Sequence, residues 1–176
     1  MSSPRTLVLF NYDWDQLGFA RWAPEFPSDS AGFDLFSFPS NVHLVNFDLE
    51  RFVELLAKKA GPAGWQAVTS NHEQFGALAA ALLAEKMGWP GTPVNAVLAC
   101  QHKFHARQVL AQVAPEANTP FSLLSSRYGE AVPEDIVYPV FVKPIKAAFS
   151  VLARVVHNRA ELMALTRFGF WELWVI

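Results

Sequence analysis

The sequence predicts an α/β protein in which an open, mostly parallel sheet is followed by a smaller α+β unit. In the first half, short apolar runs alternate with amphipathic stretches and are joined by few residues, which is typical of parallel strands connected by helices. After Pro115 the pattern changes to strand-like runs separated by a polar loop. The boundary between the two regimes lies near Gly91, and one domain or two small subdomains would fit a chain of this length.

The composition is that of a chain with a sizeable core. Of its 176 residues, 52% are hydrophobic and 17% are charged, which excludes a disordered tail. The formal net charge of −2 comes with dispersed basic residues, so we expect no nucleic-acid partner and no anionic membrane partner. No apolar run has the length of a membrane span, and the single Cys100 allows no internal disulfide. A cytoplasmic protein is therefore expected.

The first elements follow from short local patterns. Residues 6–10 form a continuous apolar run that ends in polar Asn11 and Asp13, as expected of a buried strand that delivers its last residues to an exposed edge. Residues 15–27 predict a short helix followed by a loop. Residues 33–38 alternate in polarity before Pro39 and predict a second strand.

The next two helices carry clear signals. Residues 48–60 have one apolar stripe and predict an amphipathic helix that ends in the run Gly61-Pro-Ala-Gly64. Residues 65–69 predict a strand. The run Ser70-Asn-His-Glu73 has the capping residue and acidic first turn of a helix that extends to Lys86.

The second half predicts one long helix and three strands. Residues 94–113 predict a helix with Lys103 and Arg107 on one face. The expected strands are at 119–124, 138–143 and 150–156, and a helix is expected to begin at Asn158.

Lys143 follows an apolar strand, where a charge is unusual. Removing an ammonium group from water costs several kcal/mol unless an anion or dense hydrogen bonding compensates it, so Lys143 is a candidate for anion binding. The alternative is a lysine at a strand end that reaches back to water.

The order of several motifs resembles the ATP-grasp superfamily over roughly residues 65 to 165. These motifs are a helix end, a lysine-bearing helix, a strand that ends in lysine-proline, a small-residue loop with a serine, and a glutamate-leucine pair that opens a helix. They are found at Met87-Gly-Trp-Pro-Gly91, His102-Lys-Phe-His-Ala-Arg107, Val140-Phe-Val-Lys-Pro144, Ala147-Ala-Phe-Ser150 and Glu161-Leu162.

The resemblance implies a pre-ATP-grasp domain at 1–93 and an incomplete first ATP-grasp subdomain at 94–176. It gives Lys103 and Lys143 the role of contacting ATP phosphates. The loop from Lys146 through Ser150 would fold over the phosphates, although the run from 145 to 151 contains no glycine.

The resemblance also implies a substrate and a reaction. Pre-domains of this type help to bind the carboxylate or its acceptor, which makes candidates of the polar residues after the first and third strands. These are Asn11, Asp13, Ser70 and Asn71. The implied reaction activates a small carboxylate as an acyl phosphate at the expense of ATP and magnesium, and an amine or thiol then attacks it.

In the family, the acids that bind magnesium lie in a later subdomain that would follow residue 176. We therefore assign no metal ligand and no catalytic residue, and we expect this chain to be inactive alone. The apolar residues from Phe168 to Val175 would then face the missing subdomain.

Two other functions were weighed against the ligase. A non-catalytic domain would bind a partner protein through the same aromatic terminus. A dinucleotide-binding enzyme is disfavoured, because no glycine-rich turn follows the first strand. His102 and His105 share a helical face, but no neighbouring ligand completes a zinc site.

Overall fold

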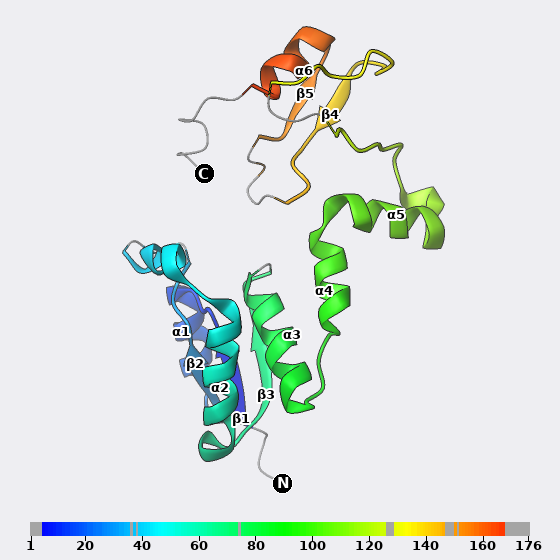
Figure 1. Cartoon of the computed structure of the whole chain (residues 1–176). Helices are drawn as coiled ribbons and strands as arrows, with labels where there is room; N and C mark the ends of the chain where they lie inside the picture. The colour runs from blue at the N-terminus through cyan, green and yellow to red at the C-terminus, as the bar shows by residue number, and fades with distance from the viewer. Residues whose placement is uncertain are drawn as a thin grey trace. The chain divides into compact units, whose positions relative to one another are not determined.

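The computed structural model describes residues 5–35, 37, 39–73, 75–125, 129–146, 150 and 152–167. It divides into two compact units, Met1–Leu98 and Ala99–Ile176 (Figure 1). Among the helices of these described residues, none is long and apolar enough to cross a membrane. The predicted domain limits at 1–93 and 94–176 stay a prediction.

The first unit is built on a parallel sheet of three strands. They are β1 (Arg5–Leu9), β2 (Ser28–Ala31) and β3 (Trp65–Ser70), in the order β2-β1-β3. Val8 in the central strand pairs with Ser30 on one side and Thr69 on the other. The predicted parallel sheet is confirmed, and the apolar run at 6–10 is its buried centre.

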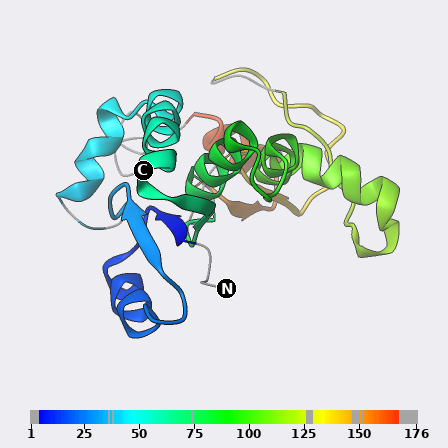
Figure 2. The same ribbon diagram turned by 90° about the horizontal axis from the view of Figure 1, so that it is seen from below.

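Helices lie on both sides of this sheet, as expected for parallel strands joined by crossover helices. α1 (Asp13–Arg21) lies on one side of the strands, and α2 (Leu49–Ala63) and α3 (Phe75–Met87) lie on the other (Figure 2). The predicted helix at 48–60 is confirmed with small shifts of its ends. The helix expected to begin at the Ser70 cap forms as well, but it begins only at Phe75 and ends at Met87.

Local signals account for the limits of α2. The Asp48 side chain accepts a hydrogen bond from the Arg51 amide at 2.9 Å, which caps the first turn. Gly64 ends the helix in the left-handed conformation (φ 71°), which glycine adopts without strain. Between the two caps, Val53, Leu56 and Ala60 are buried.

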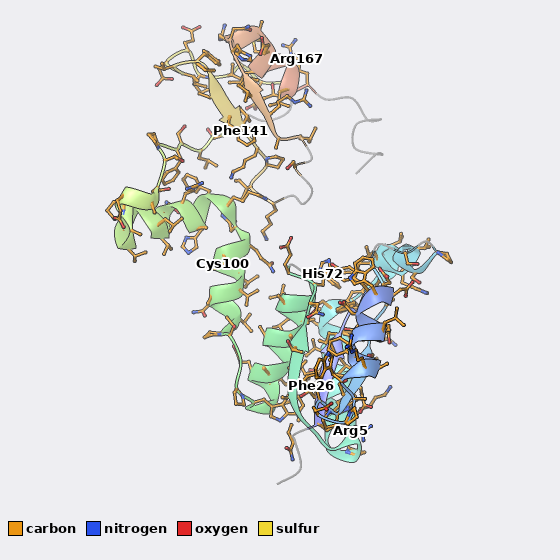
Figure 3. The ribbon with its side chains drawn as sticks, turned by 180° about the vertical axis from the view of Figure 1, so that it is seen from behind. Arg5, Phe26, His72, Cys100, Phe141 and Arg167 are labelled. Carbon is orange, nitrogen blue, oxygen red and sulfur yellow. The ribbon has the colours of Figure 1, made fainter. Side chains whose placement is uncertain are left out.

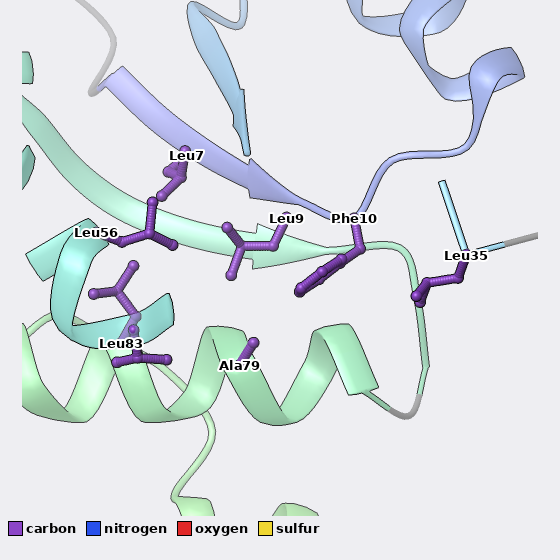
Figure 4. Close-up of a cluster of buried hydrophobic side chains, with 8 residues drawn as sticks. Leu7, Leu9, Phe10, Leu35, Leu56, Ala79 and Leu83 are labelled. Carbon is purple, nitrogen blue, oxygen red and sulfur yellow. The ribbon is translucent and has the colours of Figure 1, made fainter. Parts of the chain in front are cut away.

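Phe10 is the centre of the core between the sheet and its two helices. Its ring centroid lies 5.1 to 5.7 Å from those of four other phenylalanines, Phe33, Phe47, Phe52 and Phe75. Figure 4 shows Leu9 and Phe10 of the β1 segment beside Ala79 and Leu83 of α3. Phe10 has a positive φ of 55°, a conformation that non-glycine residues rarely adopt.

The prediction of a strand at 33–38 is wrong at its described positions. The strand that forms is the polar β2, and Phe33 and Leu35 instead pack into the core. The alternating apolar side chains Phe33 and Leu35 pack against the cluster of aromatic rings around Phe10, and they do not form one face of a strand. Positions 36 and 38 lie outside the described residues.

The second unit has a two-stranded antiparallel sheet among its described residues. β4 (Val140–Val142) pairs with β5 (Arg154–Val156), and α6 (Arg159–Leu165) follows. Val132, Val156, Leu162 and Leu165 form its buried core. Asn158 caps α6 by accepting from the Glu161 amide at 3.0 Å, as predicted.

Two predictions for this part of the chain are wrong. The expected helix at 94–113 is two helices, α4 (Val94–Gln101) and α5 (Lys103–Val113), because His102 leaves helical geometry and its Nδ1 atom accepts from the His105 amide at 3.1 Å. Residues 119–124 form no strand. Short 3-10 helices, η1 (Ser40–Asn46) and η2 (Pro115–Ala117), complete the described elements.

Candidate functional site

The carboxyl ends of β1 and β3 bring two predicted residues to one edge of the sheet. Leu9 pairs with Ser70 in the β1–β3 register, and Asn11 follows two residues after Leu9. Asn11 is buried, and its Nδ2 atom donates to Ser30 Oγ at 2.8 Å. Within the described part of the chain, the buried Asn11 Oδ1 atom has no hydrogen-bond partner. A buried acceptor without a hydrogen bond costs free energy, so this oxygen is suited to accept a hydrogen bond from a bound ligand.

Ser70 has a structural role at this edge. Its Oγ atom donates to the Leu9 carbonyl at 2.7 Å and accepts from the His72 amide at 3.1 Å. His72 Nδ1 accepts from the Gly76 amide at 3.3 Å, and burial lowers the pKa of His72, which favours the neutral ring. Ser70 therefore links the end of β3 to β1 and to the start of α3.

Asp13 and Asn71 occupy exposed positions near the same strand ends. Asp13 is the first residue of α1, and its amide donates to Asp34 Oδ2 at 3.1 Å. Asn71 follows β3 and lines an open groove together with side chains of α1. Their predicted role in binding a substrate stays a prediction.

In the second unit, the start of α5 lies beside the segment that follows β4. The backbone amide of Lys103 donates to the Ile145 carbonyl at 3.3 Å. Ile145 lies two residues after Lys143 and immediately before Lys146. Lys103 is half-buried, whereas Lys143 and Lys146 are exposed. Two lysine-bearing segments some forty positions apart in the sequence are thus neighbours in the fold.

The loop after Lys146 contains unusual backbone geometry. Ser150 and Leu152 both have positive φ, at 58° and 56°. Such conformations cost about 1–3 kcal/mol for non-glycine residues and are frequent in ligand-binding loops. The Ser150 carbonyl accepts from the Ala153 amide at 2.9 Å, which closes a turn. Positions 147–149 of the predicted phosphate loop lie outside the described residues.

An exposed apolar pair adjoins Lys143, and sequence reasoning missed it. Phe141 of β4 and Val155 of β5 are paired across the strands and are both exposed. Figure 3 labels Phe141 on β4. Their neighbours Val140, Val142 and Val156 face the core instead. Because residues 140–142 are all apolar, no pattern in the sequence separates the two faces.

The described residues contain no group of three or more His, Cys, Asp or Glu side chains that could hold a metal ion. His102, which was weighed as a ligand, uses Nδ1 to cap α5. The aromatic residues from Phe168 to Val175 lie outside the described part of the chain, so the predicted interface there is untested.

No protein-family model matches the chain, and no curated protein matches it in sequence. Solved structures with a similar fold nevertheless exist, and this fold resembles that of ATP-grasp proteins. A solved neighbour is the L-amino acid ligase from Bacillus licheniformis, which matches 94% of this chain with a TM-score of 0.64 and 18% identity.

The chain spans 42% of the length of that ligase chain. At 18% identity the likeness shows a shared fold. The α/β fold class predicted from the sequence is confirmed by this match.

Proposed function

We propose that this chain is the amino-terminal part of an ATP-dependent ligase and that Lys103 and Lys143 bind the phosphates of ATP. The observation that carries the proposal is the hydrogen bond from the Lys103 amide to the Ile145 carbonyl. It makes the start of α5 and the end of β4 neighbours, so that two cationic segments adjoin one loop.

The chemistry of a triphosphate fits such a neighbourhood. Its phosphates carry several negative charges, and nearby cations stabilise both the bound nucleotide and the charge that develops during phosphoryl transfer. Lysine acts as a compact point charge on a flexible stem, which allows it to follow the phosphate. We assign Lys146 and Ser150 to the loop that covers the phosphates.

The exposed Phe141–Val155 pair fits the remaining part of a nucleotide. Side chains of successive residues alternate between the two faces of a strand. If that alternation continues past the end of β4, Lys143 lies on the face that carries Phe141. An apolar surface is suited to contact the nucleobase of a nucleotide, and a cation beside it is suited to contact the phosphates of the same nucleotide.

In the proposed reaction, a carboxylate oxygen attacks the γ-phosphorus of ATP, ADP leaves, and an acyl phosphate forms. An amine or thiol then attacks the carbonyl carbon and expels inorganic phosphate. We propose Asn11, Asp13, Ser70 and Asn71 as the residues that bind the carboxylate substrate or its acceptor.

Magnesium would neutralise charge on the phosphates. The described residues contain no cluster of acids to hold it, so we assign no ligand. We propose that a further ATP-grasp subdomain, outside these 176 residues, supplies the metal ligands and that this chain alone has no ligase turnover. A cytoplasmic location stays a prediction.

Calorimetry with magnesium-ATP tests the proposal on this chain and on the chain joined to a complete ATP-grasp subdomain. Losing a charge-assisted contact costs about 1.5–3 kcal/mol, so Lys143→Ala and Lys103→Ala should each weaken binding about 10- to 100-fold. Lys59→Ala, at an exposed position of α2, is the matched control and should change nothing. Magnesium-ATP binding that is no tighter in the longer protein would contradict the proposal. An affinity for magnesium-ATP that neither Lys143→Ala nor Lys103→Ala changes would also contradict it.

A further inference from the structure

An open groove lies beside α1 in the first unit, whereas the proposed phosphate site belongs to the second unit. Its volume is about 470 Å³, within the range of roughly 300–1,000 Å³ that is usual for small-molecule sites. Most of its lining belongs to α1 and the turn after it, and one residue comes from the segment after β3. The lining residues are Trp14, Asp15, Gly18, Phe19, Trp22, Glu25, Phe26 and Asn71.

The walls of the groove are aromatic and largely exposed. Trp14 and Trp22 are 63% and 57% exposed, and α1 has no buried residue. The rings of Phe19 and Phe26 are stacked, with centroids 6.0 Å apart. A small protein rarely leaves this much contiguous aromatic surface in water unless it binds something.

The charge of the groove is negative. Asp15 and Glu25 are the ionisable members of the lining, and no lysine, arginine or histidine is among them. Asp15 is held in place, because its Oδ2 atom accepts from the Tyr12 amide at 3.0 Å. An ion-binding groove with carboxylates and aromatic rings suits a cation.

The surroundings of the groove carry charges of both signs. The Tyr12 ring stacks on Trp14 with centroids 4.6 Å apart. Burial, and then the carboxylates of Asp15, Asp34 and Glu73, raise the pKa of Tyr12. The Arg21 guanidinium lies 6.0 Å from the Trp22 ring centroid, so this ring already has one cation near it, and the charge of Arg21 partly offsets the charges of the carboxylates.

We propose that the groove binds a small organic ammonium ion, whose charge lies against the Trp14 and Trp22 rings and near the Asp15 and Glu25 carboxylates. Aromatic faces attract cations through their quadrupole, and two carboxylates add direct Coulomb attraction. Asn71 supplies a polar contact at the edge of the groove.

Other small ligands fit this lining less well. A phosphate or carboxylate ligand would be repelled by Asp15 and Glu25. A neutral apolar ligand would remove water from both carboxylates without compensating them. A divalent metal ion would make no use of the rings and would need more oxygen ligands than two carboxylates and one amide supply.

The test compares charged probes with uncharged probes of the same shape. Choline is matched by 3,3-dimethylbutan-1-ol, and butylammonium by pentan-1-ol, with binding to the 176-residue chain followed by tryptophan fluorescence and by NMR of the indole N–H groups. We expect saturable binding of the ammonium probes and at least tenfold weaker binding of their uncharged counterparts.

Variants locate the site. Glu25→Gln and Trp22→Ala should each weaken ammonium binding at least fivefold, and Trp22→Phe should retain much of it. Glu50→Gln, at an exposed position of α2, is the control. Equal binding of charged and uncharged probes, insensitivity to both variants, or no saturation up to about 50 mM would overturn the proposal and would favour a protein segment as the occupant.

This inference does not rest on the proposed ligase function. Lys143→Ala should leave ammonium binding unchanged, and Trp22→Ala should leave magnesium-ATP binding unchanged. Either site can therefore fail its test without affecting the result for the other.

Discussion

Asp29 links all three strands of the parallel sheet, and its removal tests the account of that sheet. Its carboxylate accepts from Arg5 Nε at 2.7 Å and Arg5 Nη2 at 2.6 Å, a bidentate pair between β2 and β1. It also accepts from Trp65 Nε1 in β3 at 2.6 Å. We predict that Asp29→Asn, which keeps the shape and removes the charge, destabilises the first unit.

The expected loss of stability follows from the lowered pKa of the Asp29 carboxyl group. The Arg5 hydrogen bonds and then the Trp65 hydrogen bond lower the pKa of Asp29 from 3.8 to about 2. A difference of this size corresponds to about 2 kcal/mol between charged and neutral forms. Because 30% of the Asp29 side chain is exposed, solvent screening reduces the expected loss to about 1 kcal/mol.

The pH dependence has a definite sign. The folded pKa lies below the unfolded one, so the stabilisation is fully present above about pH 4 and is lost as the pH falls towards 2. Urea unfolding followed by circular dichroism at pH 7, 4 and 2.5 should show the gap between wild type and Asp29→Asn narrowing with acid. A gap of the same size at pH 7 and pH 2.5, or no gap at pH 7, would refute this reasoning.

Glu54→Gln is the matched control for that experiment. Glu54 pairs with Lys86, and both side chains are substantially exposed. Surface pairs of this kind contribute little to stability. We expect the control to unfold like the wild type.

Two further predictions concern packing. Leu83→Ala removes three buried carbon atoms from a fully buried side chain. The free energy of unfolding measured with urea should therefore fall by about 3 kcal/mol. A loss below about 1 kcal/mol would argue against the core as described. At Gly76 an added Cβ would overlap Ser70 Oγ, so Gly76→Ala should lower the free energy of unfolding by about 1–3 kcal/mol. The double variant with Ser70→Ala should cost less than the sum of the single variants, and strict additivity would contradict the contact.

Several elements of both units were predictable because their signals are local. The apolar run at 6–10, the stripe of α2 between Asp48 and Gly64, and the cap at Asn158 each depend on a few neighbouring residues. A capping side chain or a stripe with helical spacing selects its conformation before any distant contact forms.

Other elements depended on partners that are distant in the sequence. β2 is polar and has no strand pattern of its own, and it forms where Asp29 meets Arg5 and Trp65. The apolar residues at 119–124 match a strand pattern, but the described part of the chain contains no strand that pairs with them. Lone strands have no local hydrogen bonds, so pairing decides which apolar runs become strands.

The candidate sites divide in the same way. The sequence alone determined which lysines are worth testing, since Lys143 follows an apolar run and Lys103 lies in one of the motifs that resemble the ATP-grasp superfamily. Only the tertiary structure decided that their segments are neighbours, through the bond from Lys103 to Ile145, and that aromatic and acidic side chains around α1 share a groove. Both depend on contacts that close long loops, and local sequence patterns do not encode which loops close.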